Sequence, residues 1–274
     1  MASPPVQRPD WYTAVMKILA SAAAGIVVLV ILFYAFDSYI YSEKQGDPGR
    51  SGSPMVSVTP VSHASAVIRF DDTVIFTDPV GESDAYAQLP APDLILLTDI
   101  HGDHLSTSTL TALAGNATII APQAVKDLLP AELAARTQVL AHSERVTELD
   151  FDSLALPMYN LPESADSRHP KGRGNGYVFE RDGFRLSVAG DTAGIPEMRA
   201  LRDIDIALIP MNLPFTMSVE DAADAVLAFR PAQVYPYHYR GQDGLSDVAR
   251  FKELVDAGNA DVEVVLLDWY PADN

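Results

Sequence analysis

The segment from Asp99 to His104, DIHGDH, places four carboxylate and imidazole side chains within six residues. It directly follows the apolar run Leu94–Thr98, which is typical of a buried strand. Side chains two apart in an extended backbone point the same way, so Asp99 and His101 share a face, and the glycine permits the turn that brings Asp103 and His104 toward it. Carboxylate and imidazole are usual ligands of zinc, manganese and iron. The segment therefore predicts a metal site at a strand end, and the alternative is a polar loop with two hydrogen-bonded histidines.

Three later segments each add one side chain that can bind a metal, beside an expected strand. His169 lies in the glycine-rich run RHPKGRGNG, Asp191 follows the strand expected at 184–188, and His238 follows the strand expected at 234–237. Taken singly, such a histidine is more often a hydrogen-bonded loop residue, and Gly-Asp-Thr is a common turn. Their joint occurrence beside strand ends favours one metal centre shared with the Asp99–His104 segment.

Short β-rich runs alternate with helical stretches from Val56 onward. The runs 66–70 and 74–78, separated by Asp-Asp-Thr, predict a hairpin. Further strands are expected at 94–98, 118–121, 151–158, 176–180, 184–188, 204–210, 234–237 and 262–267. Helices are expected at 108–113, after Pro122 and Pro196, and at 218–229 and 246–257, the last two capped by Ser218 and Ser246. The pattern predicts one α/β domain over residues 55–274, with two packed sheets covered by helices.

Residues 18–36 carry no charged side chain and as a helix would be roughly 28 Å long, close to the thickness of a bilayer's hydrocarbon core. They predict an uncleaved single-pass transmembrane helix, with a buried core helix and a cleaved signal peptide as alternatives. Residues 1–17 then form an N-terminal tail, and the Gly-, Ser- and Pro-rich residues 37–54 form a tether. Arg8 and Lys17 before the span favour a soluble domain on the extracytoplasmic (periplasmic) side of the membrane.

The charge and the cysteine count narrow the function classes. With 19 Lys and Arg against 37 Asp and Glu, the formal net charge is −18, which repels DNA and RNA phosphates. A nucleic-acid partner is therefore not expected. The chain has no cysteine, which excludes disulfides, thiolate metal ligands and a cysteine nucleophile.

The order of these motifs resembles the metallo-β-lactamase superfamily over about residues 58–269. It is most similar to the branch of ascorbate-phosphate lactonase-like hydrolases and N-acyl-phosphatidylethanolamine phospholipases. Ser62-His63-Ala64-Ser65 followed by Thr77-Asp78-Pro79, and Phe215-Thr216-Met217-Ser218, also fit that branch. The resemblance implies an αββα four-layer sandwich with two divalent metal ions at one edge.

The resemblance also implies the ligands. One ion would be bound by Asp99, His101 and His169, the second by Asp103, His104 and His238, and Asp191 would bridge the two. The family usually has histidine where this chain has Asp99. A carboxylate is a harder ligand, so manganese, iron or mixed occupancy become candidates beside zinc, and a weak first site is left open. Asp78 is expected either to orient a ligand histidine or only to close the turn before Pro79.

The implied activity is that of a membrane-anchored metal-dependent hydrolase that uses a metal-bridged hydroxide to cleave an ester, lactone or phosphodiester. Asp103 or His63 would protonate the leaving group, and Tyr239 or Arg240 would stabilise developing negative charge. The substrate would be a small molecule or a lipid-derived compound, because of the membrane anchor at 18–36. The alternative is a catalytically inactive metal-binding or scaffold protein on the same fold. His142 shows no partner pattern and is expected to be solvated.

Overall fold

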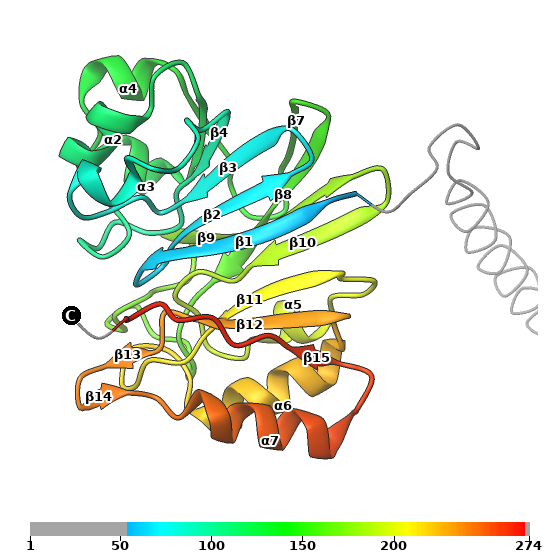
Figure 1. The fold of residues 1–274 in the computed structure, drawn as a ribbon. Helices are drawn as coiled ribbons and strands as arrows, with labels where there is room; N and C mark the ends of the chain where they lie inside the picture. Colours follow the sequence, from blue (N-terminus) through cyan, green and yellow to red (C-terminus); the bar gives the residue numbers. More distant parts are fainter. Residues whose placement is uncertain (1–53, 272–274) are drawn as a thin grey trace, which may run out of the picture. The chain divides into compact units, whose positions relative to one another are not determined.

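The computed structural model describes residues 54–271, which form two β-sheets flanked by helices (Figure 1). The first sheet has the order β1 (Val56–Ser62), β2 (Ser65–Phe70), β3 (Thr73–Thr77), β4 (Leu94–Leu96), β5 (Thr118–Ala121), β6 (Thr137–Val139). The second has the order β15 (Glu263–Val264), β12 (Gln233–Tyr237), β11 (Ile206–Pro210), β10 (Phe184–Val188), β9 (Gly174–Arg181), β8 (Phe151–Met158), β7 (Arg145–Glu148). The predicted hairpin at 66–78 is confirmed, because β2 and β3 pair antiparallel.

The helices lie on the outer faces of the two sheets. The short η1 (Ser83–Tyr86), α2 (Thr107–Leu113), α3 (Gln123–Lys126) and α4 (Ala131–Ala135) accompany the first sheet, while α5 (Pro196–Arg199), α6 (Val219–Phe229) and α7 (Val248–Gly258) accompany the second. A small hairpin of β13 (Arg240–Gly241) and β14 (Gly244–Leu245) follows β12. In Figure 1, α2 and α4 lie beside the first sheet, and α6 and α7 lie beside the second.

Alternation along the strands of the first sheet produces this layering. Val67 and Phe76 belong to a core shared with α2 and α3, whereas Ile68 and Ile75 face the core shared with the second sheet. Successive side chains of a strand point to opposite faces, so a strand that is apolar on both must be covered on both. The order of layers is therefore helices, sheet, sheet, helices, and the predicted α/β class with two packed sheets is confirmed.

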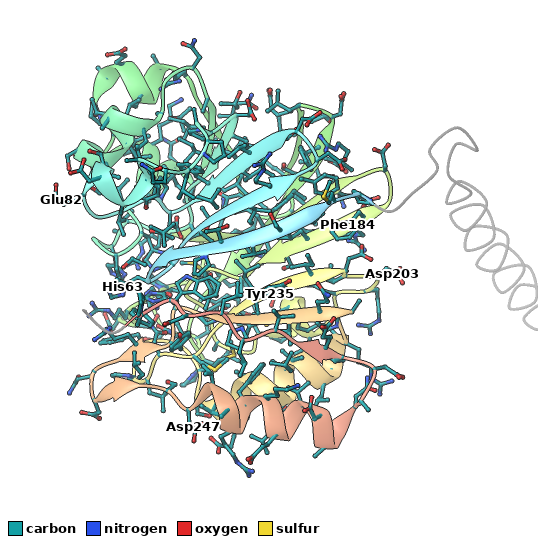
Figure 2. All side chains as sticks on the ribbon, in the orientation of Figure 1. His63, Glu82, Phe184, Asp203, Tyr235 and Asp247 are labelled. Carbon is teal, nitrogen blue, oxygen red and sulfur yellow. The ribbon has the colours of Figure 1, made fainter. Side chains whose placement is uncertain are left out.

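Parallel pairing brings several strand ends to one edge of the molecule. The strand β3 pairs parallel with β4, and β10, β11 and β12 pair parallel in succession. Their carboxyl ends lead to the loops that carry Asp78, Asp99, Asp191, Asn212 and His238. Figure 2 labels His63 at this edge and Asp203, which precedes β11, at the opposite edge.

Glycine lets the two sheets approach closely at that edge. A Cβ at Gly174 would lie 2.7 Å from the carbonyl oxygen of Thr98 and 2.1 Å from Met158 Cε. The next residue, Asn175, donates its backbone N–H to the same Thr98 oxygen at 2.9 Å. This contact joins the start of β9 to the residue that precedes Asp99.

Several expected boundaries are wrong, since β4 ends at Leu96 and not at 98, β11 begins at Ile206 and not at 204, and α7 and β15 also differ. The helix α7 begins at Val248 and is capped by Asp247, whose side chain accepts a hydrogen bond from the Arg250 N–H at 2.8 Å. Ser246 does not cap it, because its hydroxyl donates to the carbonyl oxygen of Met211 instead. The strand expected at 262–267 is only β15, since residues beyond Val264 continue as irregular chain. In contrast, Ser218 caps α6 as predicted and accepts from the Asp221 N–H at 3.0 Å.

The predicted transmembrane helix at 18–36 and nearly all of the tether at 37–54 lie outside the described residues. Within residues 54–271, no helix combines the length and apolar character that crossing a bilayer requires.

Candidate metal centre

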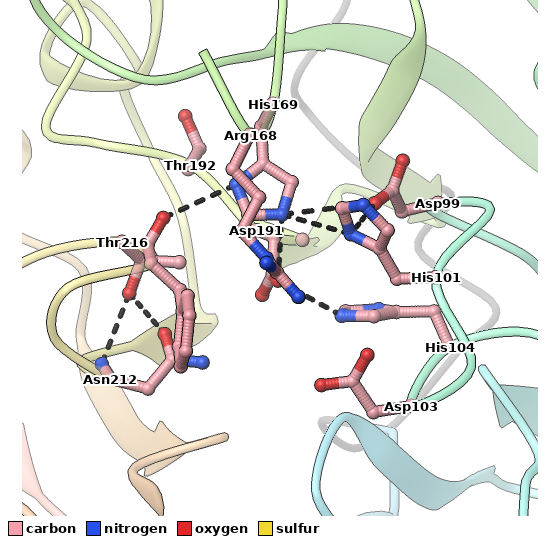
Figure 3. A network of polar contacts seen from close by, with 12 residues as sticks. Asp99, His101, Asp103, His104, Arg168, His169, Asp191, Thr192, Asn212 and Thr216 are labelled. Carbon is pink, nitrogen blue, oxygen red and sulfur yellow. Dashed lines mark hydrogen bonds and ion pairs between the residues drawn. The ribbon is translucent and has the colours of Figure 1, made fainter. Parts of the chain in front are cut away.

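The turn after β4 supplies the first group of donor atoms. Asp99 and His104 are fully buried, whereas the Asp103 side chain is 40% exposed. Asp99 Oδ2 lies 2.7 Å from His101 Nδ1, so the two side chains predicted to share a face are in contact. Figure 3 shows His101 and His104 directed toward Asp191.

Asp191, just after β10, lies at the centre of the cluster. Its Oδ2 is 3.2 Å from His104 Nε2 and 3.1 Å from His169 Nε2, and its Oδ1 is 3.3 Å from His238 Nε2. Two ligands bonded to one ion at about 2.1 Å and about 90–110° apart are separated by about 3.0–3.4 Å. The Asp191 carboxylate therefore has the position that a ligand shared by two ions needs.

Two groups of donor atoms meet at Asp191, and a third group, His63, Asp103 and His238, shares His238 with the second. Asp99, His101 and His169 form one group, in which His169 Nε2 lies 3.2 Å from His101 Nδ1. His104, Asp191 and His238 form the other, and His238 Nε2 also lies 3.4 Å from Asp103 Oδ2. The structure thus brings together all seven residues that the resemblance implied as ligands. That each of them binds an ion stays a prediction.

Buried donor atoms in the cluster lack hydrogen-bond partners. His104 Nε2 and Asp191 Oδ1 are both buried, and beyond the ion-pair contacts given above neither makes a hydrogen bond within the described residues. A buried polar atom without a partner is costly unless something else satisfies it. Imidazole nitrogens and carboxylate oxygens at ligand spacing are the set that a divalent transition-metal ion satisfies, so the residues present fit such ions.

Asp78 contacts His104, as the first of its two expected roles requires. Asp78 Oδ2 lies 2.8 Å from His104 Nδ1, and Asp78 Oδ1 accepts the Thr98 N–H at 2.7 Å. The Thr98 hydroxyl also donates to Asp78 Oδ2 at 2.5 Å. A carboxylate on one imidazole nitrogen leaves the other, Nε2, to face Asp191, as in carboxylate–histidine–metal arrangements.

Three residues of this edge have left-handed backbone conformations. The φ angles of His63, Asp78 and His238 are 47°, 42° and 47°. The surrounding structure must stabilise such conformations in residues other than glycine, and they concentrate at functional sites.

Opposite charges within the cluster shift the pKa values of its carboxyl and imidazole groups. Burial by itself raises the pKa of Asp191, but the charges of His104 and His238 hold it well below its usual value. Burial likewise lowers the pKa of His104, yet Asp191 and Asp78 raise it well above the ordinary value. Burial also opposes ionisation of Asp103, but the hydrogen bond with His238 and the charge of His104 lower its pKa. The carboxylates are therefore ionised, which is the form that binds metal ions.

Two asparagines that contact the predicted ligand histidines were missed in the sequence. Asn160 Oδ1 accepts the backbone N–H of His169 at 2.9 Å, and Asn212 Nδ2 lies 3.4 Å from His238 Nε2. The Thr216 hydroxyl accepts the backbone N–H of Asn212 at 3.1 Å and donates to Asn212 Oδ1, which fixes the asparagine side chain (Figure 3). A signal was present, because both asparagines open an Asn-Leu-Pro tripeptide, at 160–162 and again at 212–214.

Arg173, on the loop before β9, was also missed. Its guanidinium donates from Nε to Asp99 Oδ1 at 3.2 Å and from Nη2 to Asp99 Oδ2 at 3.1 Å. The side chain is 21% exposed, whereas Asp99 is buried. Its position in the glycine-rich run beside His169 was the only hint in the sequence.

Of the residues predicted to assist catalysis, His63 contacts the cluster, whereas the Tyr239 hydroxyl is bonded to the backbone of the C-terminal segment. The His63 ring packs edge-on against His238 and Tyr270, its Nδ1 is buried without a hydrogen-bond partner, and burial and then His238 lower its pKa. The Arg240 guanidinium lies 4.5 Å over the Tyr270 ring. The Tyr239 hydroxyl donates to the Leu267 carbonyl at 3.3 Å and accepts the Trp269 N–H, so Tyr239 holds the C-terminal segment.

His142 is not simply solvated, as the sequence suggested. Its Nε2 lies 2.9 Å from the carbonyl oxygen of Gly174, at the start of β9. Every other histidine of the chain belongs to the cluster or contacts it. His142 therefore contacts the backbone beside the metal centre. A variant with His142 replaced would not serve as a neutral control.

Comparison with known proteins agrees with this geometry. The family model described as "Beta-lactamase superfamily domain" matches residues 57–238. A UPF0173 metal-dependent hydrolase from Thermococcus onnurineus is 31% identical over 210 residues, which cover 73% of this chain and 92% of that protein.

Solved structures give the same result. A candidate metal-dependent hydrolase from Parabacteroides distasonis is 34% identical with a TM-score of 0.69, and the match covers 81% of this chain and 97% of that chain. Igni18, a metallo hydrolase from Ignicoccus hospitalis, is 22% identical with a TM-score of 0.65 over 78% and 95% of the two chains, which shows a shared fold alone. This chain therefore belongs to the β-lactamase superfamily and has the metallo-β-lactamase fold.

Proposed function

We propose that this metal-dependent hydrolase cleaves an ester, lactone or phosphodiester at the cluster around Asp191. The observation that carries the proposal is the contact of one buried carboxylate with three imidazoles from three different loops, at 3.1 to 3.3 Å. No serine or cysteine nucleophile is needed for such a reaction, because water can be the attacking group.

In this proposal the seven residues hold two divalent ions. Asp99, His101 and His169 would hold one, Asp103, His104 and His238 the other, and Asp191 both. Bound ions would lower the pKa of coordinated water toward neutrality and polarise the carbonyl or phosphoryl oxygen of the substrate. Three carboxylates among seven ligands make a harder donor set than imidazole alone, which favours manganese or iron as candidates beside zinc.

The residues around the second group would move protons and bind charge. The Asp103 side chain is 40% exposed and lies 3.4 Å from His238 Nε2, so in this proposal its carboxylate takes a proton from the attacking water and returns it to the leaving group. His63 presents a buried Nδ1 without a partner beside His238, and this atom can hydrogen-bond the leaving group. Arg240, held over Tyr270, supplies positive charge on the same side. Tyr239 has no part in this proposal, because its hydroxyl is engaged elsewhere.

The test is a substrate panel on the full chain, purified in detergent and supplied with Mn²⁺ or Zn²⁺. The panel contains bis(p-nitrophenyl) phosphate, p-nitrophenyl butyrate and dihydrocoumarin, which represent a phosphodiester, an ester and a lactone. We expect at least one to be hydrolysed at about 100-fold or more above the uncatalysed rate. Two bound ions per chain without turnover of any panel member would instead indicate a catalytically inactive metal-binding or scaffold protein.

We further propose that residues 18–36 anchor the chain in a membrane with the catalytic domain on the extracytoplasmic side, which makes lipid-derived substrates candidates. The apolar run supports the anchor, and Arg8 and Lys17 before it support the orientation. Replacing Val28 and Leu29 with arginine costs about 3 kcal/mol per residue at the centre of a spanning helix. We expect the double variant to be released by a carbonate wash of membranes that retains the unsubstituted chain. Equal retention of both would contradict the anchor.

A further inference from the structure

Arg173 engages both oxygens of the Asp99 carboxylate. Its Nε lies 3.2 Å from Oδ1 and its Nη2 lies 3.1 Å from Oδ2. The same Nη2 donates to the carbonyl oxygen of Arg168 at 2.6 Å, which fixes the guanidinium against its own loop. This paired geometry is the strong form of arginine–carboxylate contact.

Arg173 binds the Asp99 oxygen that faces the other donor atoms of the first group. Asp99 Oδ2 lies 2.7 Å from His101 Nδ1 and 3.8 Å from His169 Nε2, so it is the oxygen turned toward the first group. A carboxylate oxygen has two lone pairs, and on Oδ2 one accepts from Arg173 Nη2 while the other faces His101 Nδ1. Arg173 does not leave this oxygen free.

His101 is held between Asp99 and Arg173. Its Nδ1 faces Asp99, and its Nε2 lies 3.4 Å from Arg173 Nη2. A neutral imidazole carries one N–H, and a guanidinium only donates. If Nδ1 bound an ion, the ring proton would be on Nε2 and two donors would face each other. The guanidinium and an ion on Nδ1 therefore favour opposite tautomers of His101.

The second group has no such cation. In the described part of the chain, the ion-pair partners recorded for Asp103 and Asp191 are all imidazoles. A fixed guanidinium also repels a divalent ion at close range. The two groups are therefore unequal, and the inequality comes from one side chain.

We propose that Arg173 competes with a divalent ion for Asp99, so that the Asp99–His101–His169 group binds its ion more weakly and more reversibly than the His104–Asp191–His238 group. This inference rests on the proposed function, because it assumes that both groups hold ions. It makes Arg173 a positioning residue that sets metal occupancy.

Calorimetric titration of the metal-free full chain with Mn²⁺, and separately with Zn²⁺, tests the inference without any substrate. For the unsubstituted chain we expect two binding events whose dissociation constants differ by at least about tenfold. In Arg173→Met the weaker event should tighten by about 10–100-fold, the size of effect that neighbours of metal ligands have, while the stronger event stays within about twofold. Asp99→Asn should abolish the weaker event.

Two further variants control for charge and folding. Arg250→Met removes the same charge from the surface of α7, where Arg250 pairs with Glu253, and should change neither event. Arg173→Lys keeps the charge but loses the paired geometry, and should give an intermediate shift. If circular dichroism shows that Arg173→Met does not fold, Arg173→Lys tests the inference in its place.

Opposite outcomes overturn the inference. A weaker event that is unchanged or weakened in both Arg173 variants, or two equal events in the unsubstituted chain, would show that Arg173 does not compete. If the shifts occur but no panel substrate is hydrolysed, the inference stands and the proposed function fails. If substrate is hydrolysed and the Arg173 variants bind normally, only the inference fails. Absence of any Mn²⁺ or Zn²⁺ binding would overturn both.

Discussion

Replacing Asp191 with asparagine is expected to lower hydrolysis of any accepted panel substrate by at least about 1,000-fold, which corresponds to about 4 kcal/mol of lost transition-state stabilisation. Asparagine keeps the shape but not the charge, and it cannot serve two ions as a carboxylate does. The Asp191 oxygens lie within 3.3 Å of nitrogens of His104, His169 and His238, so under the proposed function both groups would lose their shared ligand. Metal content measured by mass spectrometry should fall to at most about one ion per chain.

Asp78→Asn is the graded comparison for Asp191→Asn. Asp78 contacts His104 Nδ1 and not the ion side of the ring, so its replacement should weaken metal binding by about 10–100-fold without abolishing it. Both variants should retain the circular dichroism of the unsubstituted chain. If Asp191→Asn kept its ions and activity while Asp78→Asn lost both, Asp191 would not be the shared ligand.

Chelation is expected to remove activity completely and to lower the unfolding temperature. Three ionised carboxylates lie close together in the cluster, and within residues 54–271 the side chains that form ion pairs with them are imidazoles and Arg173. Ions present at about 1,000 times their dissociation constant add about 4 kcal/mol to the stability of the folded state. For a domain of this size, that amount corresponds to about 10 °C. Differential scanning calorimetry after dialysis against EDTA measures the shift.

Re-addition of ions distinguishes this effect from simple damage. Mn²⁺, Zn²⁺ or Fe²⁺ added to the dialysed protein should restore both the activity and the unfolding temperature, and Mg²⁺ should restore less, because it prefers oxygen ligands over imidazole. If neither EDTA nor added metal changed the unfolding temperature, the cluster would be stable without ions.

Much of the cluster could be predicted from the sequence, because strand alternation and turn formation depend on residues that are close together in the chain. The alternation of Asp99 and His101 along an extended chain, the turn at Gly102 and the strand runs before Asp191 and His238 each depend on a few neighbouring residues. The same holds for Ser218 as the cap of α6. Local rules failed at α7, where adjacent Ser246 and Asp247 were both able to cap, and the contact of Ser246 with Met211 decided between them.

By itself, the sequence determined which side chains can bind metal and that each lies beside a strand end, because strand period and turn chemistry act over a few residues. Only the tertiary structure decided what each of those side chains touches. Arg173 and Asp99 are separated by 74 positions, and Asn212 and His238 by 26. Contacts over such separations depend on the register of strands and on the packing of one sheet against the other, which no short window of residues encodes.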